Sequence, residues 1–274
     1  MRHLLPAVLA CLLLAGCGAP ADTAAGVPEA TSAEILSAPS IVTEGQAPGE
    51  DLDLPTAVVS LYDWQTSGEP LALLAEIPEQ GMALYGAASG DASHVLFRWD
   101  DTLAEFPDWT IDAPKSVALE LLALDLDGDG SVEPVVSCFQ GGTQVSLYDL
   151  HVLQRSDGVL TDHQLPEALY EAQLSDLLTL GGSGQTLTIS LGSRSIEAAL
   201  PEGVQAETLE RLWTGASVSW QAEEGALWLV DKPALPPESS AAISTVYLAV
   251  LSARVSFSDG RFTLSDMTLR SELS

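Results

Sequence analysis

The sequence contains no asparagine, and its ten lysine and arginine residues are far outnumbered by 39 aspartates and glutamates. The absence of asparagine excludes N-linked glycosylation, which requires an N-x-S/T acceptor. The net charge of −29 repels phosphate groups, so we expect no nucleic-acid partner. Hydrophobic residues still make up 46% of the chain, which is enough for a packed core and argues against global disorder.

The common catalytic signatures are also missing. The sequence has no G-x-S-x-G elbow, no P-loop and no dinucleotide fingerprint. His94, His151 and His163 are not spaced as metal ligands, so structural roles are favoured for all three, the first two in strands and His163 in a loop. The six tryptophans favour core or half-buried sheet positions over a sugar-stacking platform.

Cysteine is scarce, and two of the three cysteines lie in the N-terminal segment "MRHLLPAVLACLLLAGC". This segment has a basic start and an apolar run over 4–14, a pattern typical of a secretory signal peptide. The run is too short to span a bilayer. The remaining cysteine, Cys138, lies in the apolar run "PVVSCF" and is predicted to be a small buried hydrophobe.

The end of the N-terminal segment, "LLAGC", resembles the lipobox of bacterial lipoproteins. The resemblance implies that residues 1–16 are a signal peptide, cleaved before Cys17, and that Cys17 carries the lipid. Each buried methylene contributes about 0.8 kcal/mol, so two or three acyl chains would anchor the protein firmly. We therefore expect an extracytoplasmic protein whose membrane contact is this lipid anchor.

Composition divides the rest of the chain in two. Residues 17–55 are rich in Ala, Pro, Ser, Thr, Gly and acids and lack aromatic residues, which is typical of a flexible tether. Residues 56–274 contain short apolar or alternating runs separated by Gly, Pro and Asp, which indicates β-strands. "SDG" near the C-terminus and "EEG" further upstream are predicted to be hairpin turns.

Two segments of this domain favour helices. "LPEALYEAQLSDLLTLGG" places leucines on one side of a helix over 166–178, with Pro166 in the first turn and Gly181 or Gly182 as the cap. "VQAETLERLW" is a weaker helical candidate over 204–213. The predicted fold is thus mainly β, in the α+β class, with antiparallel sheets and hairpins, one or two packed helices and a disordered tether before them.

One acidic stretch, "LALDLDGDGSVEPVV", suggests a cation site. Counted from Asp125, carboxylates fall at positions 1, 3, 5 and 9, a glycine at 6 and a backbone carbonyl at 7. Oxygens in this order can surround a hard cation, and glycine at position 6 permits the sharp turn. An EF-hand would need a glutamate at position 12, but Val136 is there, and the flanks are predicted to be strands. The alternative is a charged turn without metal.

The strand–DxDxDGxxE–strand form resembles the calcium loops of integrin-type FG-GAP (VCBS) repeats. The resemblance implies a Ca²⁺ ion held by side-chain oxygens and one backbone oxygen; the implied ligands are Asp125, Asp127, Asp129, Glu133 and the carbonyl of Ser131. The larger region from the loop through "FQGGTQVSLYDLHVLQ" is similar to uncharacterised bacterial surface lipoproteins. That similarity implies architecture and location but no activity.

The sequence favours a non-catalytic binding or interaction module, anchored in the membrane, with a β domain that calcium stabilises. Its candidate ligands are a surface protein or a carbohydrate. The alternative is an extracellular hydrolase whose carboxylates are assembled only by the fold, since a pair among 39 acids cannot be recognised from spacing alone. A deep pocket with converging carboxylates would favour the enzyme.

Overall fold

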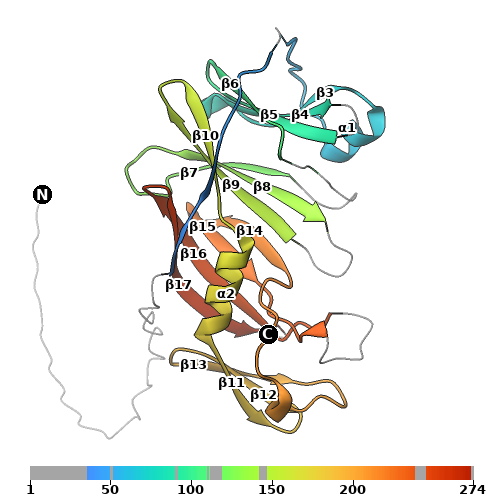
Figure 1. The fold of residues 1–274 in the computed structure, drawn as a ribbon, viewed down its shortest axis with the longest axis vertical. Coiled ribbons are helices and arrows are strands. Elements are labelled where there is room, and N and C mark those ends of the chain that lie inside the picture. The colour runs from blue at the N-terminus through green and yellow to red at the C-terminus, as the bar shows by residue number, and fades with distance from the viewer. Residues whose placement is uncertain are drawn as a thin grey trace, which may run out of the picture. The chain divides into compact units, whose positions relative to one another are not determined.

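The computed structural model describes residues 36–49, 52–89, 92–109, 111, 119–141, 147–237 and 245–272. In these residues the chain forms four antiparallel sheets and two α-helices (Figure 1). This confirms the expected mainly β fold with packed helices. The predicted signal peptide and Cys17 lie outside the described residues.

The first sheet is a four-stranded meander in the order β3-β4-β5-β6. Its strands are β3 (Leu71–Ile77), β4 (Met82–Ser89), β5 (Ala92–Trp99) and β6 (Thr102–Phe106), with the short 3₁₀ helix η1 (Pro78–Gln80) between the first two. Large side chains from this sheet, among them Phe97 and Phe106, are completely buried. They belong to a core that the meander shares with one face of the next sheet.

Helix α1 (Leu61–Ser67) lies in "TAVVSLYDW", one of the short apolar runs that the sequence predicts to be β-strands, and corrects that prediction. Its N-terminus is capped by the Ser60 Oγ, which accepts a hydrogen bond from the Asp63 amide at 3.1 Å. Gly68 ends the helix in the left-handed region, with φ of 74°. The apolar run therefore gave a wrong prediction because two local capping signals outweigh β propensity in so short a segment.

The middle sheet has five strands in the order β2-β10-β9-β8-β7. They are β2 (Ile41–Glu44), β7 (Glu120–Leu124), β8 (Glu133–Gly141), β9 (Leu147–Ser156) and β10 (Val159–Gln164). Side chains alternate between its faces, so each face packs into a different core. Val136 and Cys138 pack with the meander, whereas Val135 belongs to the core of the C-terminal sheet. Cys138 is buried, as the sequence predicted.

The C-terminal sheet also has five strands, in the order β1-β17-β16-β15-β14. They are β1 (Leu36–Pro39), β14 (Val218–Glu223), β15 (Ala226–Asp231), β16 (Ala249–Ser258) and β17 (Arg261–Ser271). Both predicted hairpin turns are confirmed: Glu224–Gly225 joins β14 to β15, and Asp259–Gly260 joins β16 to β17. All four turn residues have φ between 51° and 77°, as tight hairpins require.

Helix α2 (Glu167–Leu177) confirms the stronger helical prediction, with Pro166 at its N-cap. It leads directly into the last sheet, formed by β11 (Leu178–Ser183), β12 (Thr186–Leu191) and β13 (Arg194–Ala199). Gly181 and Gly182 therefore lie inside a strand and do not cap the helix. The second predicted helix is reduced to the single 3₁₀ turn η2 (Ala206–Thr208), after which the backbone at Leu209 is extended.

Residues 36–44 differ from the flexible tether expected over 17–55. They form β1 and β2, which are consecutive in the chain but pair with different sheets, β1 with β17 and β2 with β10. Between them, the Ser40 Oγ donates a hydrogen bond to the Gly260 carbonyl at 2.7 Å. Composition missed this because edge strands are held by backbone hydrogen bonds, which need few apolar side chains.

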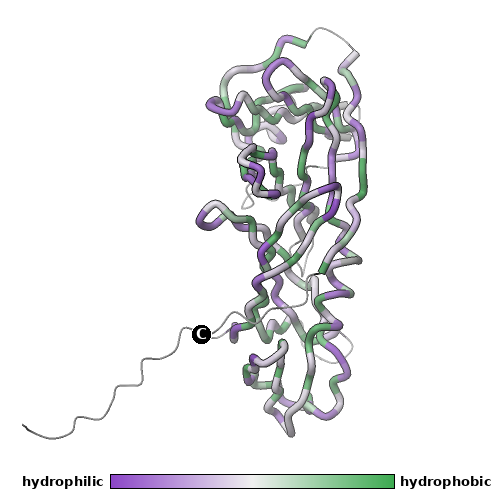
Figure 2. Tube along the Cα trace, turned by 90° about the vertical axis from the view of Figure 1, so that its left-hand side faces the viewer, coloured by the Kyte–Doolittle hydropathy of each residue, from purple (hydrophilic) through white to green (hydrophobic). Residues whose placement is uncertain are grey.

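Among the described residues, no helix is long and apolar enough to cross a membrane. Figure 2 shows the hydropathy changing repeatedly along the chain. Burial also alternates along β17, where the side chains of Phe262 and Leu264 are buried and that of Thr263 between them is partly exposed. β17 thus turns apolar side chains toward the core and more polar ones away from it.

Candidate metal centre

The acidic loop, residues 125–133, connects β7 to β8 in the middle sheet. The strand pairing closes at Leu124 and Glu133, which lie opposite each other, so the hairpin form predicted for this stretch is confirmed. Leu126 is buried in the core of the C-terminal sheet, and its carbonyl accepts a hydrogen bond from the Phe257 amide of β16 at 3.2 Å. The buried Leu126 therefore anchors the loop to this core.

Three carboxylates of the loop converge. Asp125, Asp127 and Glu133 each offer an oxygen, and these oxygens all lie within 4.8 Å of one another. The two aspartates are exposed, whereas Glu133 is buried. An all-oxygen, carboxylate-rich donor set of this size suits a hard cation. The structure thus contains an acidic cluster that could hold a metal ion.

Backbone amides fix the shape of the loop. Asp125 accepts hydrogen bonds from the Gly128 amide at 2.7 Å and from the Gly130 amide at 3.0 Å. Both glycines have positive φ, 79° and 89°, which lets the chain curl around the first carboxylate. The sharp turn predicted at Gly130 is therefore present. Each carboxylate oxygen has two lone pairs, so these hydrogen bonds leave room for a cation.

The surroundings of Glu133 in the loop raise the pKa of its carboxyl group. Burial raises the pKa of its carboxyl group, the hydrogen bond from the Leu126 amide at 2.9 Å lowers it, and the three nearby aspartates raise it again. Four of these five influences oppose the charged form. A divalent cation among the carboxylates would reverse the repulsion between them. The residues present therefore fit a cation both in donor type and in charge.

One of the four predicted carboxylate ligands, Asp129, lies in the loop but outside the converging group. The Asp129 Oδ1 accepts a hydrogen bond from the Ser131 amide at 2.7 Å, and both residues are exposed. In this arrangement Asp129 contributes charge near the group without adding an oxygen to it. Ser131 could take part through its backbone carbonyl alone, as the sequence predicted.

A cleft of about 690 Å³ opens beside the loop and is lined in part by Glu133. Its other wall carries Trp99 and Arg155, whose guanidinium lies 4.6 Å from the centroid of the indole ring. Two glutamines, Gln80 and Gln154, also line it. Of the described residues, Glu133 is the one carboxylate on this surface, so the cleft lacks the carboxylate pair of a glycosidase.

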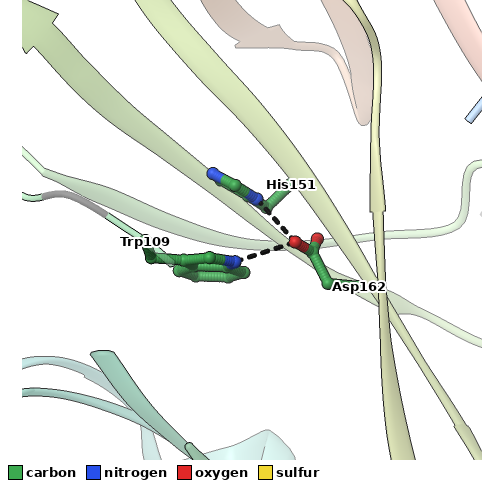
Figure 3. Close-up of polar contacts among 3 residues, drawn as sticks. All are labelled: Trp109, His151 and Asp162. Atoms are coloured by element: carbon green, nitrogen blue, oxygen red, sulfur yellow. Dashed lines mark hydrogen bonds and ion pairs between the residues drawn. The ribbon is translucent and has the colours of Figure 1, made fainter. Parts of the chain in front are cut away.

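A second polar group, which we call the histidine cluster, consists of Trp109, His151 and Asp162 (Figure 3). The Asp162 Oδ2 accepts a hydrogen bond from the Trp109 Nε1 at 2.8 Å and lies 2.9 Å from the His151 Nδ1. The indole and imidazole rings stack with centroids 3.8 Å apart. All three side chains are buried.

Spacing along the sequence did not reveal the histidine cluster, although one signal was present. The turn at Asp157–Gly158 makes β9 and β10 a hairpin, in which His151 lies opposite Gln164 and Leu153 lies opposite Asp162. His151 and Asp162 are therefore diagonal neighbours on one face. His163, predicted to be in a loop, is also in β10, on the opposite face, where it contacts Phe257.

Comparison with known proteins gave no support from relatives: no family model, no curated protein and no solved structure matches the chain. The assignment of function therefore rests on the residues and their geometry.

Proposed function

We propose that this chain is a membrane-anchored extracytoplasmic lipoprotein whose β domain is stabilised by calcium and serves as a non-catalytic binding or interaction module. The observation that carries the proposal is the convergence of Asp125, Asp127 and Glu133 within 4.8 Å. Their all-oxygen donor set and the order of ligands along the loop favour Ca²⁺ over transition metals.

The role of the ion is structural in this proposal. The loop joins two adjacent strands, and its Leu126 is packed in the core, so a bound cation would hold the hairpin in its folded form. Extracellular calcium modules bind with dissociation constants of about 0.1–1 mM. With a value of about 0.1 mM and about 1 mM free Ca²⁺, binding would add about 1.4 kcal/mol to the free energy of unfolding.

The cleft beside the loop supports a binding role over a hydrolytic one. It presents an indole, a guanidinium and two glutamine amides but a single carboxylate among the described residues. Such a surface can donate several hydrogen bonds to a polar ligand, for example a carbohydrate, whereas hydrolysis of a glycoside requires two carboxyl groups.

The test is a thermal melt of the full chain in EDTA, then with about 1 mM free Ca²⁺, with Mg²⁺ as the ionic control. We expect a calcium-specific rise in Tm of about 3–6 °C, because 1.4 kcal/mol shifts a domain of this size by that amount. Asp127→Asn should remove most of the rise. Asp157→Asn, the same change in a turn without clustered acids, should leave it intact. A melt that calcium does not change would rule out the structural ion.

The lipid anchor is tested separately, since Cys17 lies outside the described residues. Cys17→Ser should release the protein from the membrane fraction or block its maturation, because the thioether-linked lipid can no longer form. Fractionation with and without detergent measures this directly. Unchanged membrane association of the variant would count against lipidation and would leave the calcium proposal untouched.

A further inference from the structure

A groove of about 400 Å³ lies between helix α1, strand β3 and the chain that leads into the helix (Figure 1). Most of its lining is apolar and comes from all three segments: Pro55, Ala57, Val59, Trp64, Leu71 and Ala72. Neither the acidic loop nor the histidine cluster contributes a residue to it. The groove is therefore a surface separate from both of these sites.

Hydrogen bonds fix the walls of the groove. Trp64 is buried in α1, and its Nε1 donates to the Glu69 carbonyl at 2.8 Å, which ties the helix to the loop that follows it. The Val59 amide donates to the Leu73 carbonyl at 2.9 Å, which ties the opposite wall to β3. The groove is therefore formed before any partner arrives, and binding requires little ordering of this surface.

Exposed apolar side chains are concentrated in the same part of the chain. Of the large hydrophobic residues exposed in the described structure, Leu52, Val58 and Tyr62 all lie in the segment that leads into α1 or in its first turn. Val58 is 52% exposed. Single exposed hydrophobic residues are common on protein surfaces, but their concentration beside an apolar groove is typical of a surface that another molecule covers.

The charges on the groove favour a basic partner. Two carboxylates, those of Asp63 and Glu69, belong to its lining, which includes no lysine or arginine. Both residues are exposed, and neither forms an ion pair with another described residue. The Asp63 Oδ2 accepts one hydrogen bond, from the Ser60 Oγ at 2.7 Å. A cationic group beside an apolar one would therefore be attracted here, whereas an anionic group would be repelled.

The same charges argue against two other occupants. The expected tether over 18–35 contains acids but no lysine or arginine, so it does not complement the two carboxylates. A second copy of the chain would bring a further net charge of −29, which opposes association of like molecules. A basic partner, in contrast, is attracted both by the groove and by the net charge of the whole protein.

We propose that this groove binds a segment of a partner protein in which apolar side chains are flanked by lysine or arginine. The apolar side chains would leave water between the walls of the groove, and the basic ones would pair with Asp63 and Glu69. This proposal rests on the interaction role proposed above, but not on calcium or on the lipid anchor. It can therefore fail while the calcium proposal holds.

The experiment is an isothermal titration of the full chain with a synthetic hexapeptide that has two central leucines between two pairs of lysines. The protein is held in nanodiscs of zwitterionic phospholipid, and empty nanodiscs are the blank. We expect a dissociation constant on the order of 0.1 mM, because two leucine side chains and two exposed ion pairs contribute modestly to binding. Absence of binding up to about 1 mM peptide would overturn the proposal.

Two control peptides separate the apolar from the charged contribution. Replacing the leucines with serines, or the lysines with glutamates, should weaken binding at least about tenfold in each case. Equal binding of the serine peptide would mean that net charge alone attracts the ligand. Equal binding of the glutamate peptide would mean that the carboxylates do not select the partner. Either result would overturn the proposal.

Variants locate the peptide on the protein. Ala57→Trp, at an exposed position of the lining, should fill part of the groove and weaken binding at least about tenfold. Asp63→Asn combined with Glu69→Gln should weaken it about fivefold, because each exposed ion pair contributes little. Glu202→Gln combined with Glu210→Gln is the matched control, since it removes the same charge from exposed positions outside the lining. Equal affinity of Ala57→Trp and the parent chain would overturn the assignment to the groove.

Two further measurements test the other places and occupants. Titrations in EDTA and in about 1 mM free Ca²⁺ should agree, and binding seen only in EDTA would place the peptide on the acidic loop instead. Cross-linking of the full chain in vesicles tests for a second copy in the groove. A cross-linked dimer that Ala57→Trp abolishes would make that copy the occupant and overturn the basic partner.

Discussion

The carboxylates of the acidic loop come from nine consecutive residues and mostly face solvent, whereas the side chains that meet at Asp162 come from separate segments and are buried. The loop concentrates like charges and relies on solvent to screen them. The histidine cluster places one carboxylate between two donors in a dry environment, where each contact is stronger and each unpaired atom is costlier. An aspartate in the acidic loop is therefore expected to contribute less to stability than the buried Asp162.

The largest effect on stability is expected for a substitution in the histidine cluster. Asp162→Ala would leave the Trp109 Nε1 and the His151 Nδ1 without their acceptor, both in the core. Two unpaired buried donors, at about 2 kcal/mol each, should lower the free energy of unfolding by about 4 kcal/mol. Asp127→Ala, an exposed site measured without calcium, should change it by less than about 0.5 kcal/mol. Urea unfolding measures the free energy of unfolding of both variants. Similar losses in the two would contradict the expected difference between the histidine cluster and the acidic loop.

Asp231 is a third test of how burial affects an aspartate, because it is fully buried outside both the acidic loop and the histidine cluster. Burial raises its pKa to about 7 from 3.8, although the Gly215 amide donates to Oδ1 at 3.0 Å. The folded state therefore keeps this proton between about pH 4 and pH 7 while the unfolded chain has lost it, so stability falls as pH rises through this window.

The variant Asp231→Asn removes this titration. The free energy of unfolding of the variant relative to the parent should rise by about 3 kcal/mol between pH 5 and pH 8, since one pKa unit corresponds to about 1.4 kcal/mol. Denaturant unfolding at several pH values tests it. A difference that stays constant with pH would mean that Asp231 titrates normally in the folded protein.

The smallest expected effect lies within the acidic loop. Asp125→Asn and Asp127→Asn should each remove most of the calcium-dependent gain of about 1.4 kcal/mol, because both carboxylates belong to the converging group. Asp129→Asn should remove less, since its oxygen lies outside that group. The calcium-dependent rise in Tm of the three variants ranks their effects. If the Asp129 variant lost as much of the rise as the other two, the loop would have to rearrange when calcium binds.

Several features of the fold follow from local signals. The hairpin turns at Asp259–Gly260 and Glu224–Gly225 could be predicted because tight turns require positive φ, and α2 could be predicted from its leucine spacing. Helix α1 could have been recognised from Ser60 and Gly68, its two caps. The edge strands β1 and β2 could not, since backbone pairing with distant strands leaves little trace in composition.

The sequence by itself determined the acidic loop, because its carboxylates are close along the chain and a hairpin brings them together. It also determined the mainly β class through alternating runs and turn residues. Only the tertiary structure decided which carboxylates converge, that residues 36–44 join two sheets, and that Trp109, His151 and Asp162 meet. These outcomes depend on strand register and on packing between sheets, which distant residues fix jointly and no short stretch encodes.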